Sequence, residues 1–126
     1  AFRDVTQVTE LFPGLGYTAV KGDDRMVEQV FRFTEGHKVE RVIQDENIHY
    51  LHMVFQKNEG LPEHFSNANL YMTVLRGTLS IGLNDQEIHE YGAGTVLKIP
   101  FQTRMNVGNR HDDTLELIVV KAPAPK

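Results

Sequence analysis

The sequence predicts an all-β domain built from short antiparallel strands arranged as a sandwich or a barrel. After Met26, apolar and polar residues alternate with a period of two in one short run after another, which is the pattern of strands that bury one face. Glycine, asparagine and aspartate recur between these runs and mark turns. With 126 residues, the chain is long enough for one domain with one hydrophobic core.

Residues 1–25 are predicted to form an N-terminal arm. Apolar residues recur there at roughly helical spacing after Asp4, a residue type that caps helices, and Pro13-Gly14 ends any helix. Two interpretations remain open: a short helix, or an ordered arm that packs on a neighbouring surface.

A β-barrel domain is predicted for residues 26–121, followed by an extended tail at residues 122–126 that adds nothing to the core. The alternation places strands at residues 26–33, 39–43, 48–56, 70–75, 78–83, 87–91, 95–99, 104–107 and 115–121. Pro100 has no N–H to donate and must therefore lie at a strand end or bulge. This number of short strands is typical of an all-β sandwich or barrel.

The third predicted strand illustrates the two faces. Leu51 and Met53 are predicted to face the core, whereas Tyr50 and His52 face outward or into another subunit. His49 shares the parity of the core residues but lies near the end of the strand.

The composition excludes several classes of function. Cysteine is absent, which removes disulfides, thiolate nucleophiles and cysteine-based zinc sites. The net charge of -4 argues against a nucleic-acid or anionic-membrane partner. No apolar run approaches the ~20 residues that span a bilayer, and the first residues show no signal-peptide pattern. We therefore expect a cytoplasmic protein.

The segment GLPEHFSNANLYMTVLRG, residues 60–77, resembles the first motif of the cupin family, the small jelly-roll barrels. Its matching positions, and those of the second cupin motif, are Gly60, Pro62, His64, Gly77, Gly94, Ile99, Pro100 and Asn109. The resemblance covers about residues 48–120. It implies a cupin-type jelly-roll β-barrel, which would carry the N-terminal arm or helix at residues 1–25.

The resemblance also shows which metal-binding side chains are missing. His64 takes the place of the first histidine of the cupin cradle, whereas Ser66, Leu70 and Met105 occupy the positions of the second histidine, the glutamate and the last histidine. A divalent ion in this cradle needs imidazole and carboxylate ligands. We therefore predict no first-row metal at this position, and no cofactor.

Two metal-binding alternatives stay open at this point. In a different register, Glu63 and His64 would chelate an ion together with a distant histidine. A copper site made from a methionine thioether and a histidine is the second alternative.

The predicted ligand site is a largely apolar barrel interior with one titratable group. Its candidate ligand-binding residues are His64, Ser66, Asn67, Asn69, Met72 and Met105. Such a lining suits a small molecule. The structural alternative is that the methionines fill the core and that the asparagines satisfy a turn. Arg104 is a further candidate, as a clamp for an anionic group or as a solvated arginine.

The sequence thus predicts a metal-independent cupin that binds a small molecule. The alternative is a cupin enzyme of isomerase, lyase or oxygenase type in which His64 acts as base or metal ligand; a third option is a structural or partner-binding protein. A homodimer is also expected, because cupins commonly pair and because the arm and the outward row at Tyr50 and His52 are otherwise unexplained.

Overall fold

The computed structural model describes residues 27–34 and 38–126. The chain divides into two units between Val30 and Phe31, and the following description concerns the unit Phe31–Lys126. The arm predicted for residues 1–25 lies outside the described residues.

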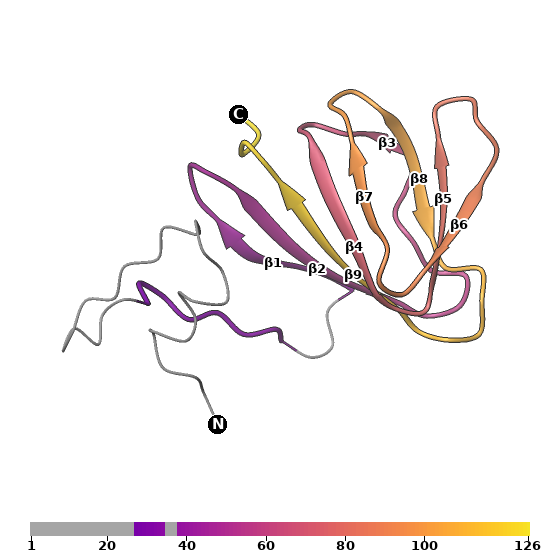
Figure 1. Ribbon diagram of the computed structural model, residues 1–126, viewed down its shortest axis with the longest axis horizontal. Coiled ribbons are helices and arrows are strands. Elements are labelled where there is room, and N and C mark those ends of the chain that lie inside the picture. The colour runs from indigo at the N-terminus through magenta and orange to yellow at the C-terminus, as the bar shows by residue number, and fades with distance from the viewer. Residues whose placement is uncertain (1–26, 35–37) are drawn as a thin grey trace, which may run out of the picture. The chain divides into compact units, whose positions relative to one another are not determined.

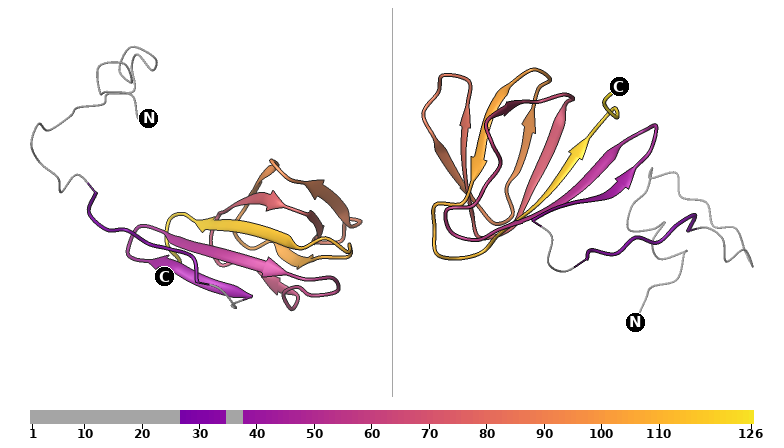
Figure 2. Two further views of the ribbon diagram at one scale, coloured as in Figure 1. Left: turned by 90° about the horizontal axis from the view of Figure 1, so that it is seen from below. Right: turned by 180° about the vertical axis from the view of Figure 1, so that it is seen from behind.

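Nine strands form in this unit, in two antiparallel sheets (Figure 1). They are β1 Val39–Gln44, β2 His49–Phe55, β3 His64–Phe65, β4 Leu70–Arg76, β5 Thr78–Leu83, β6 His89–Gly92, β7 Val96–Ile99, β8 Arg104–Gly108 and β9 Leu115–Lys121. The five-stranded sheet has the order β1-β2-β9-β4-β7, and the four-stranded sheet has the order β3-β8-β5-β6. Figure 2 shows the two sheets from below and from behind. The prediction of an all-β jelly-roll fold is confirmed.

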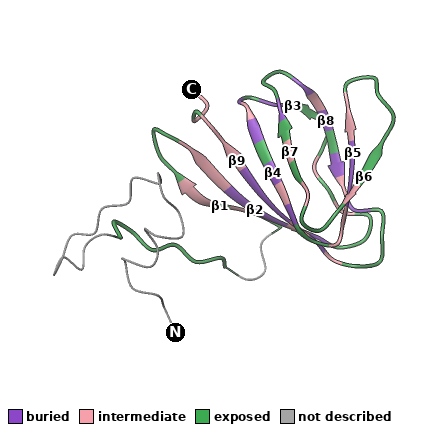
Figure 3. Cartoon of the chain, in the orientation of Figure 1, coloured by how far each residue is buried: buried purple, intermediate pink, exposed green. Residues whose placement is uncertain are grey.

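The core lies between the two sheets and is formed mainly by inward-facing residues of β2, β4, β5, β8 and β9. In β9, Leu115, Leu117 and Val119 are buried and face the four-stranded sheet, whose Leu79 and Ile81 are equally buried. The predicted strands at residues 78–83 and 115–121 have the observed boundaries. Figure 3 shows that burial is concentrated in the central strands and that β1, β6 and β7 at the sheet edges are more exposed.

The predicted strand at residues 26–33 was wrong, because residues 27–34 form no strand. Side-chain contacts replace a strand ladder at the end of this segment. The ring of Phe33 stacks on His52, with centroids 3.9 Å apart and planes inclined by 4°. The backbone N–H of Thr34 donates to the carboxylate of Glu40.

Two short segments before β4 also differ from the prediction. Residues 64–65 form β3 in the four-stranded sheet, whereas Leu70 begins β4 in the other sheet. The chain therefore crosses between sheets at residues 66–69. Within β3, His64 pairs with Met105 of β8.

A polar network lies on the outer face of the five-stranded sheet. His52 is buried and its Nε2 lies 2.6 Å from a carboxylate oxygen of Glu116, whose other oxygen accepts a hydrogen bond from Arg76 Nε at 3.1 Å. The network joins β2, β9 and β4. Phe33 covers it from outside, which explains why a histidine is buried on an outward-facing position.

Gly77 closes the hairpin between β4 and β5 in a conformation that only glycine adopts easily. Its φ is +80°, and an added Cβ would meet the carbonyl oxygen of Thr114 and lie 2.9 Å from Cα of Leu115. Gly94 has a similar φ of +89°, but an added Cβ there meets no atom within 4 Å. The two glycines therefore separate the cost of backbone strain from the cost of a clash.

We expect Gly77→Ala to destabilise the protein clearly more than Gly94→Ala. Positive φ alone costs about 1 kcal/mol for alanine, and Gly77→Ala adds the displacement of the backbone at Thr114. The free energy of unfolding, measured by urea denaturation, checks this. Equal losses in the two variants would show that the backbone contact at Thr114 is unimportant.

Candidate functional site

Ser66 ties the crossing between the sheets to the turn between β7 and β8. Its hydroxyl donates to the carbonyl of Pro100 and accepts from the N–H of Thr103, both at 2.8 Å. The backbone of Ser66 also pairs with Gln102 and Thr103. Ser66 is 3% exposed, and a hydroxyl that is buried and bonded in this way has a structural task.

Asn69 connects three segments at the same end of the barrel. Its side-chain oxygen accepts from the N–H of Phe101 at 3.0 Å, and its backbone carbonyl accepts from the N–H of Ala122 at 3.2 Å. The tail is also held by a bond from the N–H of Ala124 to the carbonyl of Asn47 at 2.9 Å. The tail predicted at residues 122–126 is therefore packed against the barrel end.

A cavity of about 510 Å³ lies between these segments. Its lining comes from residues 67–69, the turn at Phe101 and the tail, and consists of Asn67, Ala68, Asn69, Phe101, Pro123, Ala124, Pro125 and Lys126. Most of this lining is apolar, and the two asparagines belong to the predicted site. Both the volume and the mixed lining are typical of small-molecule sites.

Lys121 lies beside this cavity on the inner face of the five-stranded sheet. Its Nζ donates to the side-chain oxygen of Asn67 at 2.8 Å. It pairs with His49 on one side and Leu70 on the other. Burial lowers the pKa of the Lys121 ammonium, and the positive charge of Arg41 lowers it further.

The remaining predicted site residues lie in two different environments. Met72 and Met105 are each 1% exposed and belong to the hydrophobic core. His64 pairs with Met105 and so faces the same side of its sheet, but it lies on the edge strand and is exposed. Its Nδ1–H donates to the carbonyl of Pro62 at 2.9 Å. The structure thus brings Asn67 and Asn69 together at one cavity and leaves both methionines outside its lining.

The residues at the cupin metal positions do not fit a metal ion. Both hydrogen bonds of the Ser66 hydroxyl go to the backbone, Leu70 and Met105 are core residues, and His64 is the single imidazole of the set. Within residues 27–34 and 38–126, no group of three histidine, aspartate or glutamate side chains is placed to hold an ion. Glu63, the carboxylate of the alternative register, lies 3.4 Å from Arg104. Arg104 also pairs with Asp85 at 2.6 Å, so this candidate clamp is occupied by carboxylates of the chain itself.

Sequence reasoning missed Lys121, Phe101 and the tail. The alternation along β9 gives Lys121 the parity of Leu117 and Val119, so an inward lysine was detectable from the sequence. No local pattern indicates that the tail returns to the barrel end, because Asn47 and Asn69 hold it through backbone bonds.

Comparison with known proteins settles the family. No family model matches the chain. An uncharacterized protein of Methanocaldococcus jannaschii, MJ0764, is 36% identical over 104 residues, which cover 80% of this chain and 90% of that protein. The crystal structure of MJ0764, an RmlC-like cupin family protein with a double-stranded β-helix fold, aligns with a TM-score of 0.74 and 35% identity over 79% of this chain and 94% of that chain. The chain belongs to the cupin family.

More distant cupins share the fold alone. A cupin-like protein of Thermotoga maritima aligns with a TM-score of 0.63 at 19% identity, over 68% of this chain and 67% of that chain. A cupin superfamily protein of Desulfitobacterium hafniense aligns with a TM-score of 0.60 at 14% identity, over 67% of this chain and 74% of that chain. The family is established by MJ0764, which is itself uncharacterized.

In the described part of this cupin, no helix has the length and apolar character needed to cross a membrane.

We expect Lys121→Met to be slightly more stable than the wild type at pH 7. The ammonium is partly desolvated in the folded protein, so methionine removes a cost that we place below about 1 kcal/mol, because water still reaches the group. With the folded-state pKa lowered, the unfolded chain binds more protons between that pKa and 10.5. The free energy of unfolding of the wild type should therefore rise as the pH rises from the lowered pKa to 10.5. The difference in stability between Lys121→Met and the wild type should shrink over the same range.

Urea denaturation at pH 7 and at alkaline pH measures both effects. Lys57→Met, which removes an exposed ammonium that pairs with Asp112 on the surface, is the control and should change the stability little. A Lys121→Met variant that is less stable than the wild type at pH 7 would contradict the expected burial cost.

Proposed function

We propose that this protein is a metal-independent cupin that binds a small molecule at the barrel end. The observation that carries the proposal is the cavity of about 510 Å³ closed by Asn67, Asn69, Phe101 and the tail. Phe101 is 55% exposed, so a large apolar ring stands open to solvent at the turn between β7 and β8. Burial of such a ring by a ligand is favourable.

The absence of fit for an ion supports binding over metal-dependent catalysis. A cupin oxygenase needs an ion with several protein ligands, and the cradle positions supply one imidazole. A base role for His64 stays the alternative, because its neutral ring keeps Nε2 as an acceptor while Nδ1 donates to Pro62.

Phe101→Ala is expected to weaken binding of a small molecule by about fivefold or more, since an aromatic contact contributes on the order of 1 kcal/mol. A thermal-shift screen across sugars, organic acids and divalent ions identifies a compound, and titration of the variants gives its Kd. Phe65→Ala is the matched control, since Phe65 is 64% exposed and does not line the cavity.

Two outcomes would count against this proposal. Equal Kd values in Phe101→Ala and the wild type would place the ligand elsewhere. A thermal shift with manganese, iron, nickel or zinc that disappears in His64→Ala would favour the enzyme alternative.

We further propose that the protein forms a homodimer through the outer face of the five-stranded sheet. Strand pairing places Tyr50, Val120 and Tyr71 in one row and Ile118 and Val96 in the next, all on that face. Val96 is 64% exposed and Tyr71 is 38% exposed. These apolar side chains lie beside the polar network of His52, Glu116 and Arg76, and exposed apolar side chains on a sheet face favour association.

Val96→Asp should shift the protein toward the monomer in light scattering at micromolar concentration, because it places an uncompensated charge in the apolar face. Phe65→Asp is the control, as Phe65 has the same exposed fraction and lies on the other sheet. A wild-type protein that is monomeric under these conditions would overturn the dimer proposal.

A further inference from the structure

The strand residues that face the barrel interior include basic side chains and no acidic ones. In the nine strands of the described unit, the acidic residues are Glu40, Glu90 and Glu116, and each one pairs with a residue of an outer face, namely His52, Ser80 and Val54. Lys121 is half-buried and pairs with His49 on the inner face, and Arg41 pairs with the core residue Leu51, although its side chain is exposed on the edge strand β1. The chain as a whole carries a net charge of -4. The strand residues on the inner face therefore differ from the whole chain in the sign of their charge.

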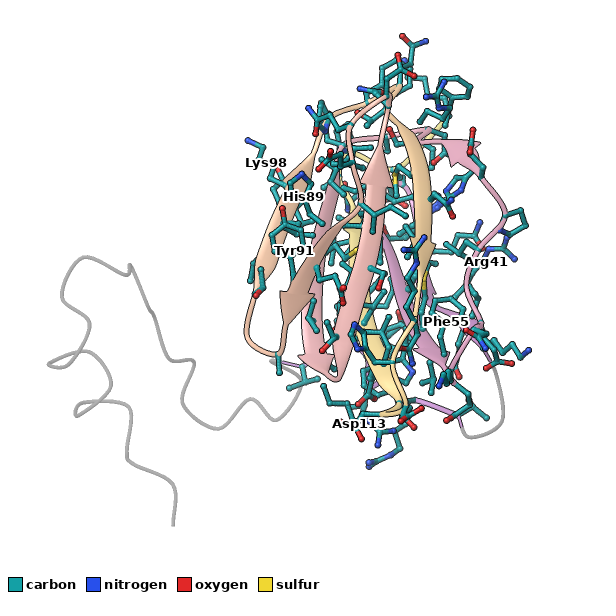
Figure 4. All side chains as sticks on the ribbon, turned by 90° about the vertical axis from the view of Figure 1, so that its right-hand side faces the viewer. Arg41, Phe55, His89, Tyr91, Lys98 and Asp113 are labelled. Atoms are coloured by element: carbon teal, nitrogen blue, oxygen red, sulfur yellow. The ribbon has the colours of Figure 1, made fainter. Side chains whose placement is uncertain are left out.

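The basic residues are concentrated at the end of the barrel that holds the cavity. Gln44, His49, Lys121 and Leu70 form one row across the five-stranded sheet, at the last or first residue of their strands. The crossing at residues 66–69 and the tail leave the barrel at the same end (Figure 1). In Figure 4, Arg41 lies on the opposite side of the barrel from His89, Tyr91 and Lys98.

Lys121 connects this charge directly to the cavity. Its Nζ is bonded to the side-chain oxygen of Asn67, which is itself a lining residue. Among residues 27–34 and 38–126, no carboxylate lies within ion-pair distance of Lys121 or Arg41. A partly buried ammonium with one neutral partner is incompletely compensated, and an anionic ligand would supply the missing charge.

We infer that the ligand of this site carries a carboxylate, which binds Lys121, and an apolar body, which packs against Phe101 and the prolines of the tail. This inference rests on the proposed function. A carboxylate suits the site better than a phosphate, because its cationic groups are the lysines Lys121 and Lys126, whereas phosphate sites in proteins usually add a guanidinium fork or convergent backbone donors. Arg41 adds a long-range attraction that favours anions over neutral compounds.

Matched pairs of probes test the inference. Benzoate and phenylacetate are titrated into the full chain in parallel with benzamide and phenylacetamide, and backbone amide shifts of Asn67, Asn69 and Phe101 report occupancy of the cavity. We expect each acid to bind at least about tenfold more tightly than its amide. Lys121→Met should reduce the affinity of the acids to that of the amides and leave the amides within about twofold. Lys98→Met, on the outer face, should change neither.

The outcomes separate this inference from the proposed function. Equal affinities for acids and amides in the wild type would overturn the carboxylate assignment and leave the cavity as a ligand site. Shifts confined to other residues, or no binding of any probe at millimolar concentration, would overturn both. Phenyl phosphate is the third arm: tighter binding than phenylacetate, lost in Lys121→Met, would replace the carboxylate by a phosphate.

Discussion

The barrel end depends on the hydroxyl of Ser66, which satisfies two backbone groups of the turn between β7 and β8. Through Pro100 and Thr103 it fixes that turn to the segment where the chain passes from one sheet to the other. The turn between β7 and β8 places Phe101 in the lining of the cavity. The segment at residues 66–69, which crosses between the sheets, contributes Asn67 and Asn69. Ser66, which stands at the position of the second cupin histidine, therefore holds together the two segments that line the cavity.

The acidic strand residues of the five-stranded sheet lie on its outer face, whereas Lys121 lies on its inner face. On the outer face, Glu116 lies between His52 and Arg76, and the ring of Phe33 stacks on His52. On the inner face, the half-buried Lys121 has no carboxylate partner in the described residues, and burial holds the pKa of Lys121 below its usual value. Stability alone favours the opposite choice on the inner face, since a buried charge without a counter-ion is costly. Groups that are kept against this cost are frequently functional.

The fold was largely predictable because strand alternation and turn residues are local signals. The run from Leu115 to Lys121 is rich in β-branched and other apolar residues, and its boundaries in the structure are the predicted ones. Residues 26–33 show the same alternation, yet residues 27–34 form no strand; alternation reports a residue pattern and says nothing about whether a pairing partner exists. β3 was not predicted, because two residues are too few to show an alternation of apolar and polar side chains.

The candidate site was less predictable because it is made by contacts between distant segments. Asn67 and Asn69 were identified, whereas the tail that completes their cavity is held by bonds to Asn47 and Asn69 that no sequence pattern encodes. Met72 and Met105 were predicted as ligand-binding residues because methionine suits a pocket. In the structure both lie among the core residues. The inward orientation of Lys121 could be predicted from its position in the strand. Its place beside the cavity follows only from the bond to Asn67 in the structure.

The irregularity in β1 links the composition of the interior to the behaviour of the sheet edge. The register with β2 shifts between Arg41 and Ile43, so that Ile43 pairs with the outward Tyr50 and Gln44 with the inward His49. A regular strand would turn Ile43 inward and close the rim with another aliphatic side chain. The extra residue, Val42, thus places Gln44 instead of Ile43 on the inner face at the end of β1 and makes that end of the barrel hydrophilic. It also interrupts the free hydrogen-bonding ladder of an outermost strand, which protects the protein against edge-to-edge fibre growth.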